Sequence, residues 1–319
     1  MENSVLFSSA FIIVGSLLLY FGADALVKGA SRLAIRLGIT PMIIGLTVVA
    51  FGTSAPELVV SLSAGMRGKA DIALGNVIGS NICNIALILG LSALIRPLDV
   101  NYKTAGKDIF IMVAVSVITL LLAFDGELTT IDGAILIVGI ISYVMFNIHK
   151  SKKDSADVSV DELTETKYMN KNILHILMVI AGLVILMMGA NLFLEGAVRM
   201  AKMFNLSDAV IGLTIVALGT SLPELATSAV ASYKKHSDIS LGNVLGSNIF
   251  NLLMILGATS IFFPINSTGI KVVDVALMIL LSVIIVPLSY RKNVINRYSG
   301  AFLLLIYTSY MYYLFMITK

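Results

Sequence analysis

The sequence predicts an all-α integral membrane protein of ten transmembrane helices, built as two inverted five-helix repeats with broken core helices. Three observations predict this fold. Hydrophobic residues make up 58% of the 319 residues and charged residues only 13%, whereas a soluble domain carries about 25% charged residues. Long apolar segments follow one another along the whole chain, and a polar block of the first half recurs in the second. Most of the surface must therefore face lipid.

Each predicted span is a mostly apolar run of about 20 residues, the length that crosses a bilayer. The runs lie at 5–27, 41–66, 71–95, 107–124, 130–148, 172–193, 208–233, 238–263, 271–289 and 298–317. Residues 149–171 interrupt the pattern because they are polar, charged and without apolar periodicity. We therefore divide the chain into a first repeat at 1–148, a loop at 149–171 and a second repeat at 172–319.

Lysine and arginine are unevenly shared between the two sides that this topology creates. Most of the 22 lie on the side of the 149–171 loop, and the side richer in these residues is normally cytoplasmic. The sequence thus predicts a multi-pass protein of the cell membrane, with a cytoplasmic central loop and both termini outside.

The repeat is visible as sequence identity. A shift of 167 residues lays 45–90 over 212–257 without a gap, so that GTSAPE at 52–57 meets GTSLPE at 219–224. Because each half has an odd number of spans, the second half enters the membrane from the opposite side. Many secondary transporters have this inverted plan, with the substrate site between the repeats. A duplicated scaffold or receptor is the alternative, but it would not require identical polar residues.

Glu57 and Glu224 are the carboxylates near the middle of predicted spans, and no lysine or arginine occupies a comparable position. A carboxylate at this depth is costly and normally functional. We expect bound cations to supply the missing positive charge. The alternative is a pair of protonated glutamates with a structural role.

The residues around each glutamate support cation binding. Pro56 cannot donate a hydrogen bond to the carbonyl of Gly52, so the helix should bend or unwind there. Thr53 and Ser54 precede Glu57 by four and three residues, which places their oxygens on the same helix face. The second repeat has the same arrangement, with Gly219, Thr220, Ser221, Pro223 and Glu224.

A second polar block, GNVIGSNICN at 75–84, recurs as GNVLGSNIFN at 242–251. Ser80 and Asn84 share a helix face, as do Ser247 and Asn251. The glycines of this block are also typical of close helix packing. The remaining asparagines, Asn76, Asn81, Asn243 and Asn248, are expected either to join this site or to cap and bridge the broken helices.

Carboxylates, hydroxyls, amides and freed carbonyls together make a set of hard oxygen ligands. Calcium takes about 6–8 such ligands in flexible geometry. The sequence has no His or Cys cluster suited to a transition metal, and no nucleophile–base pair that would predict an enzyme. We therefore expect transported cations and no cofactor.

At these two blocks the sequence resembles the calcium/cation antiporter superfamily, and especially its prokaryotic sodium/calcium exchangers. The resemblance implies antiport of Ca²⁺ against Na⁺ by alternating access, with the first and sixth helices sliding past a core of the second, third, seventh and eighth. Matched by motif, the ion ligands would be Glu57, Glu224, Thr53, Ser54, Thr220, Ser221, Ser80, Asn84, Ser247, Asn251 and the carbonyl oxygens of Ala50 and Ala217.

One departure bears on the coupling ion. Several relatives carry aspartate where this chain has Asn251, so the site here holds two carboxylates. An antiporter of H⁺ and Ca²⁺ with the same site is the alternative, since glutamates in a dry site can take up protons. With a net charge of +3 and no basic patch, we expect no nucleic-acid partner. Nor does the sequence indicate a protein partner, because each chain holds a complete site.

Overall fold

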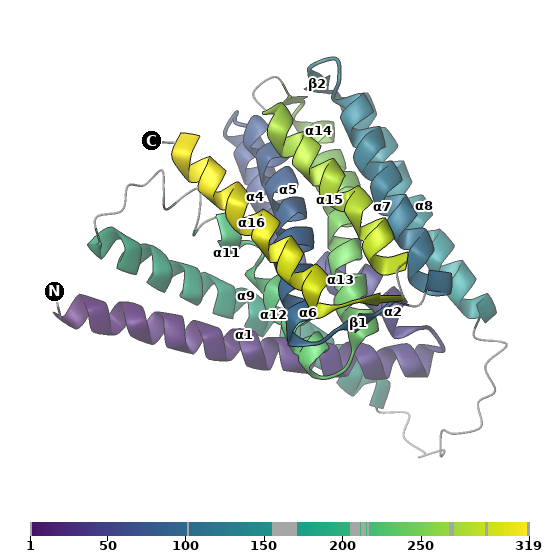
Figure 1. The fold of residues 1–319 in the computed structure, drawn as a ribbon, viewed down its shortest axis with the longest axis horizontal. Coiled ribbons are helices and arrows are strands. Elements are labelled where there is room, and N and C mark those ends of the chain that lie inside the picture. The colour runs from purple at the N-terminus through teal and green to yellow at the C-terminus, as the bar shows by residue number, and fades with distance from the viewer. Residues whose placement is uncertain are drawn as a thin grey trace.

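The computed structural model describes residues 2–100, 102–154, 171–204, 211, 215, 217–267, 271–290 and 293–317 (Figure 1). The described part of the chain is a helical bundle, as the sequence predicts. Elements labelled η are π-helical stretches, in which the helix is locally widened.

The first repeat begins with one long helix and continues with interrupted ones. Its elements are α1 (Glu2–Leu37), α2 (Pro41–Ile44), η1 (Gly45–Val49), α3 (Ala50–Thr53), α4 (Ala55–Met66), α5 (Asp71–Ile82), η2 (Cys83–Leu89), α6 (Gly90–Ile95), α7 (Tyr102–Leu122) and α8 (Thr130–Asp154).

The second repeat follows the same order. Its described elements are α9 (Lys171–Met203), α11 (Ala217–Gly219), α12 (Leu222–Tyr233), α13 (Ser237–Phe250), η5 (Asn251–Ile255), α14 (Leu256–Phe262), α15 (Val272–Tyr290) and α16 (Arg297–Ile317).

The number of membrane-crossing helices agrees with the prediction as far as the chain is described. Within the described ranges, eight helices are long and apolar enough to span a membrane, and the bent pair Pro41–Thr53 and Ala55–Met66 makes a ninth. The predicted span at 208–233 falls partly on residues outside these ranges, and its described helices are α11 and α12.

Three helices continue several residues past their predicted ends. α1 runs to Leu37 and α9 to Met203, beyond the predicted ends at 27 and 193. Hydropathy marks only the part of a helix that contacts lipid, whereas the backbone continues through charged residues that can pair along the helix surface. Lys28, which pairs with Asp24 one turn earlier at 2.7 Å, lies in this extension. α8 likewise continues to Asp154, into the predicted loop.

α1 and α9 lie side by side and cross the rest of the bundle obliquely (Figure 1). Glycines seven residues apart on each helix let the two backbones approach. A Cβ atom on Gly22 would lie 2.7 Å from the backbone nitrogen of Leu186, and one on Gly189 would lie 2.7 Å from that of Leu19. The two helices therefore pack as a pair related by the repeat.

Two antiparallel strand pairs of two residues each link loops of opposite repeats within the all-helical fold. β1 (Leu98–Asp99) pairs with β4 (Val294–Ile295), and β2 (Glu127–Leu128) pairs with β3 (Ile265–Asn266). Adding 167 to β1 gives β3, and adding it to β2 gives β4. The partners Leu98 and Ile295 thus become Ile265 and Leu128, which are also partners. The fold therefore has an internal pseudo-two-fold relation between its halves.

Among the eight continuous candidate spans of the described residues, the two that carry the second polar block are the most enclosed. In the apolar windows of Ile72–Ile95 and Ser237–Phe262, 72% and 83% of residues are buried, against 22% for Val5–Leu37. The polar blocks therefore lie inside the bundle, and α1 lies at its periphery.

Candidate functional site

The two GTS-x-PE segments are helix breaks, as the prolines predict. α3 and α4 meet at Ser54 with a bend of 43°, and α11 is separated from α12 by Thr220 and Ser221. Ser54 has φ −81° and ψ 5°, and Ser221 has φ −88° and ψ 7°. The same distortion occurs in both repeats, and each break directly precedes a glutamate.

Each glutamate is bound by a serine of the opposite repeat. Ser54 Oγ donates to Glu224 Oε1 at 3.0 Å, and Ser221 Oγ donates to Glu57 Oε1 at 3.1 Å. Both glutamates are 1% exposed. The sequence places Ser54 on the face of its own Glu57, but the hydrogen bonds cross between repeats. Since the helix bends at the serine, its hydroxyl turns toward the other half.

Two asparagines bridge the broken helices, which was one of the two roles expected for them. Asn243 Nδ2 donates to the backbone carbonyl of Glu224 at 3.4 Å and to Ser228 Oγ at 2.9 Å, and its Oδ1 accepts from Thr53 Oγ1 at 3.1 Å. Asn76 makes the equivalent bonds to the Glu57 carbonyl and to Ser61 at 3.4 and 3.2 Å. These amides hold the first turn of each glutamate helix against the second polar block.

The second polar block reaches the glutamates through Ser80. Ser221 Oγ lies 3.4 Å from Ser80 Oγ, and Asn84 follows one turn after Ser80. α12, which carries Glu224, contacts η2, which holds Asn84. In the other half, α4, which carries Glu57, contacts η5, which begins at Asn251. The elements that carry the motif residues of both repeats are thus in contact.

Several side-chain oxygens of these elements are buried without a hydrogen-bond partner in the part of the chain that the structure describes. They are Glu57 Oε2, Glu224 Oε2, Thr220 Oγ1, Ser247 Oγ, Asn84 Oδ1 and Asn251 Oδ1. A buried acceptor without a partner is costly, and Asn251 keeps its oxygen free while its amide donates to Asn81 at 3.0 Å. This donor set of carboxylate, amide and hydroxyl oxygens suits a hard cation.

The two predicted carbonyl ligands lie at the same position in each repeat. The carbonyl of Ala50 accepts from the backbone of Ser54 at 3.0 Å and from Thr53 Oγ1 at 3.3 Å. Ala217 is the first residue of α11. The Ala50 oxygen therefore lies at the break but already has two donors.

The π-helical stretches were not expected from the sequence. η2 and η5 begin beside Asn84 and at Asn251, at equivalent places in the two repeats. Such insertions are frequent at functional sites, because they shift side chains and leave carbonyls out of the regular ladder. Apolar periodicity does not report them, since η2 has only seven residues and η5 only five.

The glycines of the second repeat's block serve close packing. A Cβ atom on Gly242 would lie 2.6 Å from the carbonyl of Met42, and one on Gly246 would lie 2.6 Å from that of Leu46. For Gly75 and Gly79 no described atom lies within 4 Å, and the residues equivalent to Met42 and Leu46 are outside the described ranges.

Comparison with known proteins assigns the family. The profile of the family described as sodium/calcium exchanger protein matches residues 7–149 and 174–316. The chain belongs to the sodium/calcium exchanger family. The two matched stretches are the two repeats, so the family likeness covers nearly the whole chain.

Named relatives extend over the same length. The inner membrane protein YrbG of Escherichia coli is 36% identical over 294 residues, which cover 91% of this chain and 90% of that protein. The sodium/calcium exchanger MaX1 of Methanosarcina acetivorans is 32% identical over 345 residues, covering 96% and 98%.

A solved structure has the same fold. The sodium-calcium exchanger NCX_Mj soaked with 10 mM Na⁺ and zero Ca²⁺ superposes with a TM-score of 0.83 and 34% identity, over 95% of this chain and 97% of that one. This family member is therefore a multi-pass integral membrane protein of cation/Ca²⁺ exchanger type with inverted repeats, and it is a transporter, not an enzyme.

Proposed function

We propose that the chain is a secondary active antiporter that exchanges Ca²⁺ for Na⁺ by alternating access. Its ions bind between Glu57 and Glu224, with hydroxyl, amide and carbonyl oxygens of the four broken segments as further ligands. The names of MaX1 and NCX_Mj support sodium as the counter-ion.

The pair of buried glutamates carries this proposal. Each has one oxygen bound to the opposite repeat and one without a partner among the described residues. Within the described part of the chain, three or more His, Cys, Asp or Glu residues nowhere form a cluster that could hold a metal ion. The candidate cation site therefore has two carboxylates and is otherwise lined by neutral oxygens. The two carboxylates just balance the charge of one divalent ion, and the remaining ligands are neutral. Such a site suits an ion that is bound and released better than one that is held permanently.

The charge of the site explains why exchange is obligatory. Two ionised glutamates give −2, which one Ca²⁺ neutralises. Without a cation, the buried pair would be costly to carry through the membrane. The site therefore becomes accessible from the other side of the membrane only when a cation is bound. Each such conformational change carries one kind of ion across the membrane. If about three Na⁺ replace one Ca²⁺, as is typical of the family that the sequence resembles, the transported charge differs and exchange depends on voltage.

The packing of α1 and α9 supports the alternating-access part. The two helices form their own glycine-packed pair, and they meet the glutamate helix α12 through small and apolar side chains. A pair with close internal packing can move as one body past the broken helices, uncovering the site first on one side and then on the other.

The test is uptake of radioactive calcium into proteoliposomes. Vesicles containing the purified full chain are loaded with Na⁺ and diluted into Na⁺-free buffer, with the pH clamped on both sides. We expect calcium uptake that requires internal sodium. Vesicles loaded with choline are the matched control.

The same vesicles distinguish the coupling ion. Uptake that ignores sodium but follows an imposed pH gradient would assign the coupling to protons and keep the site. The absence of any ion-coupled calcium flux in correctly folded protein would contradict antiport altogether.

A further inference from the structure

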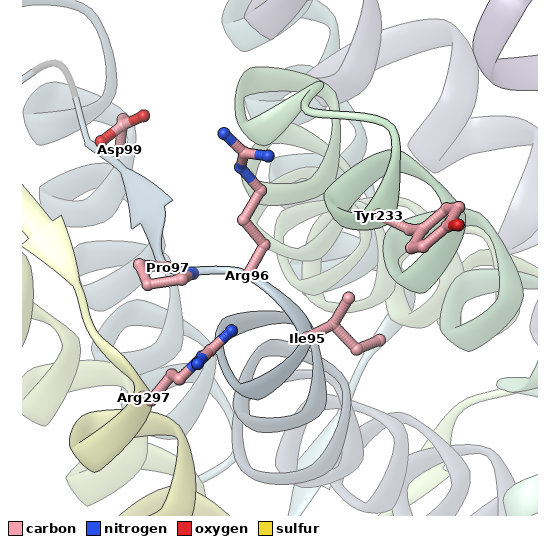
Figure 2. Close-up of a pocket in the computed structure, with 6 residues that line it drawn as sticks. All are labelled: Ile95, Arg96, Pro97, Asp99, Tyr233 and Arg297. Atoms are coloured by element: carbon pink, nitrogen blue, oxygen red, sulfur yellow. The ribbon is translucent and has the colours of Figure 1, made fainter.

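A cavity of about 530 Å³ lies at the opposite end of α12 from Glu224. Three helix ends meet there, because α6 ends at Ile95, α12 ends at Tyr233 and α16 begins at Arg297 (Figure 2). The cavity is lined by Ile95, Arg96, Pro97, Asp99, Tyr233 and Arg297. It is separate from the cation site and is not used by the exchange mechanism.

Two of the residues that line this cavity are arginines, Arg96 and Arg297. Figure 2 shows their side chains extending between the helix ends, Arg96 from the turn after α6 and Arg297 from the start of α16. Neither guanidinium makes a hydrogen bond or an ion pair with a residue that the structure describes. Asp99 is the single acidic residue of the lining, and its side chain is exposed. The lining residues therefore carry more positive than negative charge.

The surroundings favour an anion. α16 is a 21-residue helix that begins at Arg297, and the amino end of a helix attracts negative charge. Arg96 is half-buried, so an anion held there is partly shielded from water. Guanidinium groups bind phosphate through paired hydrogen bonds. We propose that this cavity binds the phosphate group of an anionic phospholipid.

The position of the cavity points to a lipid as the source of the phosphate. The candidate spans Ile72–Ile95 and Arg297–Met316 have their ends at the cavity, so it lies at the boundary between hydrocarbon and water. Tyr233 is 70% exposed, and tyrosine is typical of the headgroup layer. Lysine and arginine distribution predicts this side to be cytoplasmic, where basic pockets between spans hold anionic headgroups.

The experiment measures lipid retention by native mass spectrometry. The purified full chain in a neutral detergent is titrated with dioleoyl-phosphatidylglycerol and, separately, with dioleoyl-phosphatidylcholine. We expect tighter binding of phosphatidylglycerol. Arg96→Gln and Arg297→Gln should each weaken it by about tenfold, and Arg96→Lys should weaken it less because the charge remains but the planar fork is lost.

Two further variants make the result specific. Asp99→Asn should tighten binding by about twofold to fivefold, because it removes the repelling charge. Arg67→Gln, which changes an exposed arginine of the α4–α5 turn, should leave binding unchanged. Elution volume and thermal unfolding of each variant check that it is folded.

The outcomes separate the possible sources of phosphate. Displacement of phosphatidylglycerol by excess inorganic phosphate would show that the phosphate group alone suffices at this site. Failure of inorganic phosphate to displace it would show that the lipid chains contribute. Equal retention of the two lipids by the wild-type chain, or unchanged retention by both arginine variants, would overturn the proposal.

Discussion

At the scale of single residues, the site is built from reciprocal contacts between the repeats. Ser54 and Ser221 each fix the carboxylate of the opposite half, while Asn76 and Asn243 hold the backbone of their own half. Each glutamate therefore depends on both repeats for its position. The charge of the glutamates and the geometry of the asparagines can be tested separately.

Glu57→Gln and Glu224→Gln should each abolish exchange while the protein stays folded. The amide keeps an oxygen that can accept from Ser221 or Ser54 but loses the charge that holds the cation. Removing one partner of a buried charge interaction costs about 3–5 kcal/mol, so sodium-driven calcium uptake should fall by about 100-fold or more. Glu195→Gln, on the exposed face of α9 where Glu195 pairs with Arg199, is the matched control. Wild-type uptake by folded Glu57→Gln protein would refute the role of this carboxylate.

Asn243→Ala should destabilise the protein more than Asn76→Ala. Asn243 is fully buried and bonded to Thr53, Ser228 and the Glu224 carbonyl, whereas Asn76 is half-buried and has two such bonds. Each buried group left without a partner costs about 1–3 kcal/mol. Thermal unfolding in detergent measures the difference, and equal midpoints for the two variants would contradict the cross-repeat role of Asn243.

At the scale of elements, the molecule consists of broken helices inside and a long helix pair at the side. The breaks come from proline after a Gly-Thr-Ser turn. The π-helical stretches η2 and η5 follow in the next spans, and η1 precedes the first break. α1 and α9 contain no such interruption, and their glycines bring the backbones into contact. Interrupted helices expose polar backbone groups to ions, whereas continuous ones are suited to rigid movement.

Gly189→Val should disrupt the α1–α9 pair. Its first side-chain carbon would lie 2.7 Å from the backbone nitrogen of Leu19, which cannot move aside without shifting α1. Overpacking of this kind costs about 1–3 kcal/mol, so we expect a lower unfolding temperature and slower calcium exchange. Gly139→Ala is the matched control, because its Cβ would meet only the flexible end of Leu253 at 3.3 Å. Unchanged stability of Gly189→Val would argue against the close pairing.

At the scale of the whole molecule, the two halves are similar in sequence but differ in their contacts. Asp24 on α1 forms an ion pair with Lys234, in the turn between α12 and α13. The equivalent residues of the other repeat, 167 positions away, are Asn191 for Asp24 and Arg67 for Lys234. Both are exposed, and they make no such contact in the described structure. Because asparagine carries no charge, the ion pair cannot form at the equivalent position, so the two halves differ there in both sequence and contact.

A short thiol cross-link between cysteines at positions 24 and 234 should hold the protein in this conformation. In a chain carrying Asp24→Cys, Lys234→Cys and Cys83→Ser, we expect the cross-link to reduce calcium exchange to background and its reductive cleavage to restore it. The ion pair is lost in the cross-linked and in the cleaved protein alike. A difference in exchange between the two therefore comes from the cross-link.

The equivalent pair, Arg67→Cys with Asn191→Cys, extends this test. If the repeats exchange roles during transport, these cysteines approach in the opposite conformation and their cross-link should block exchange as well. Undiminished exchange by either fully cross-linked protein would show that the contact does not change during the cycle.

The local pattern of the sequence was sufficient to identify the inverted repeats, the helix breaks at Pro56 and Pro223 and the two buried glutamates. Each of these follows from composition, residue spacing or the chemistry of one residue type, and the fold and family agree with them. The ligand set around the glutamates, the sidedness of the membrane and the coupling ion stay predictions.

Only the tertiary structure decided which residues meet across the repeats. Three features depend on how distant helices pack. Ser54 donates a hydrogen bond to Glu224, Asp24 pairs with Lys234, and Arg96 and Arg297 line one cavity. The sequence also did not predict the lengths of α1 and α9 or the π-helical stretches. Hydrophobic periodicity records which side of a helix faces lipid, but contacts between helices depend on the pseudo-two-fold arrangement of the whole chain, which no single segment encodes.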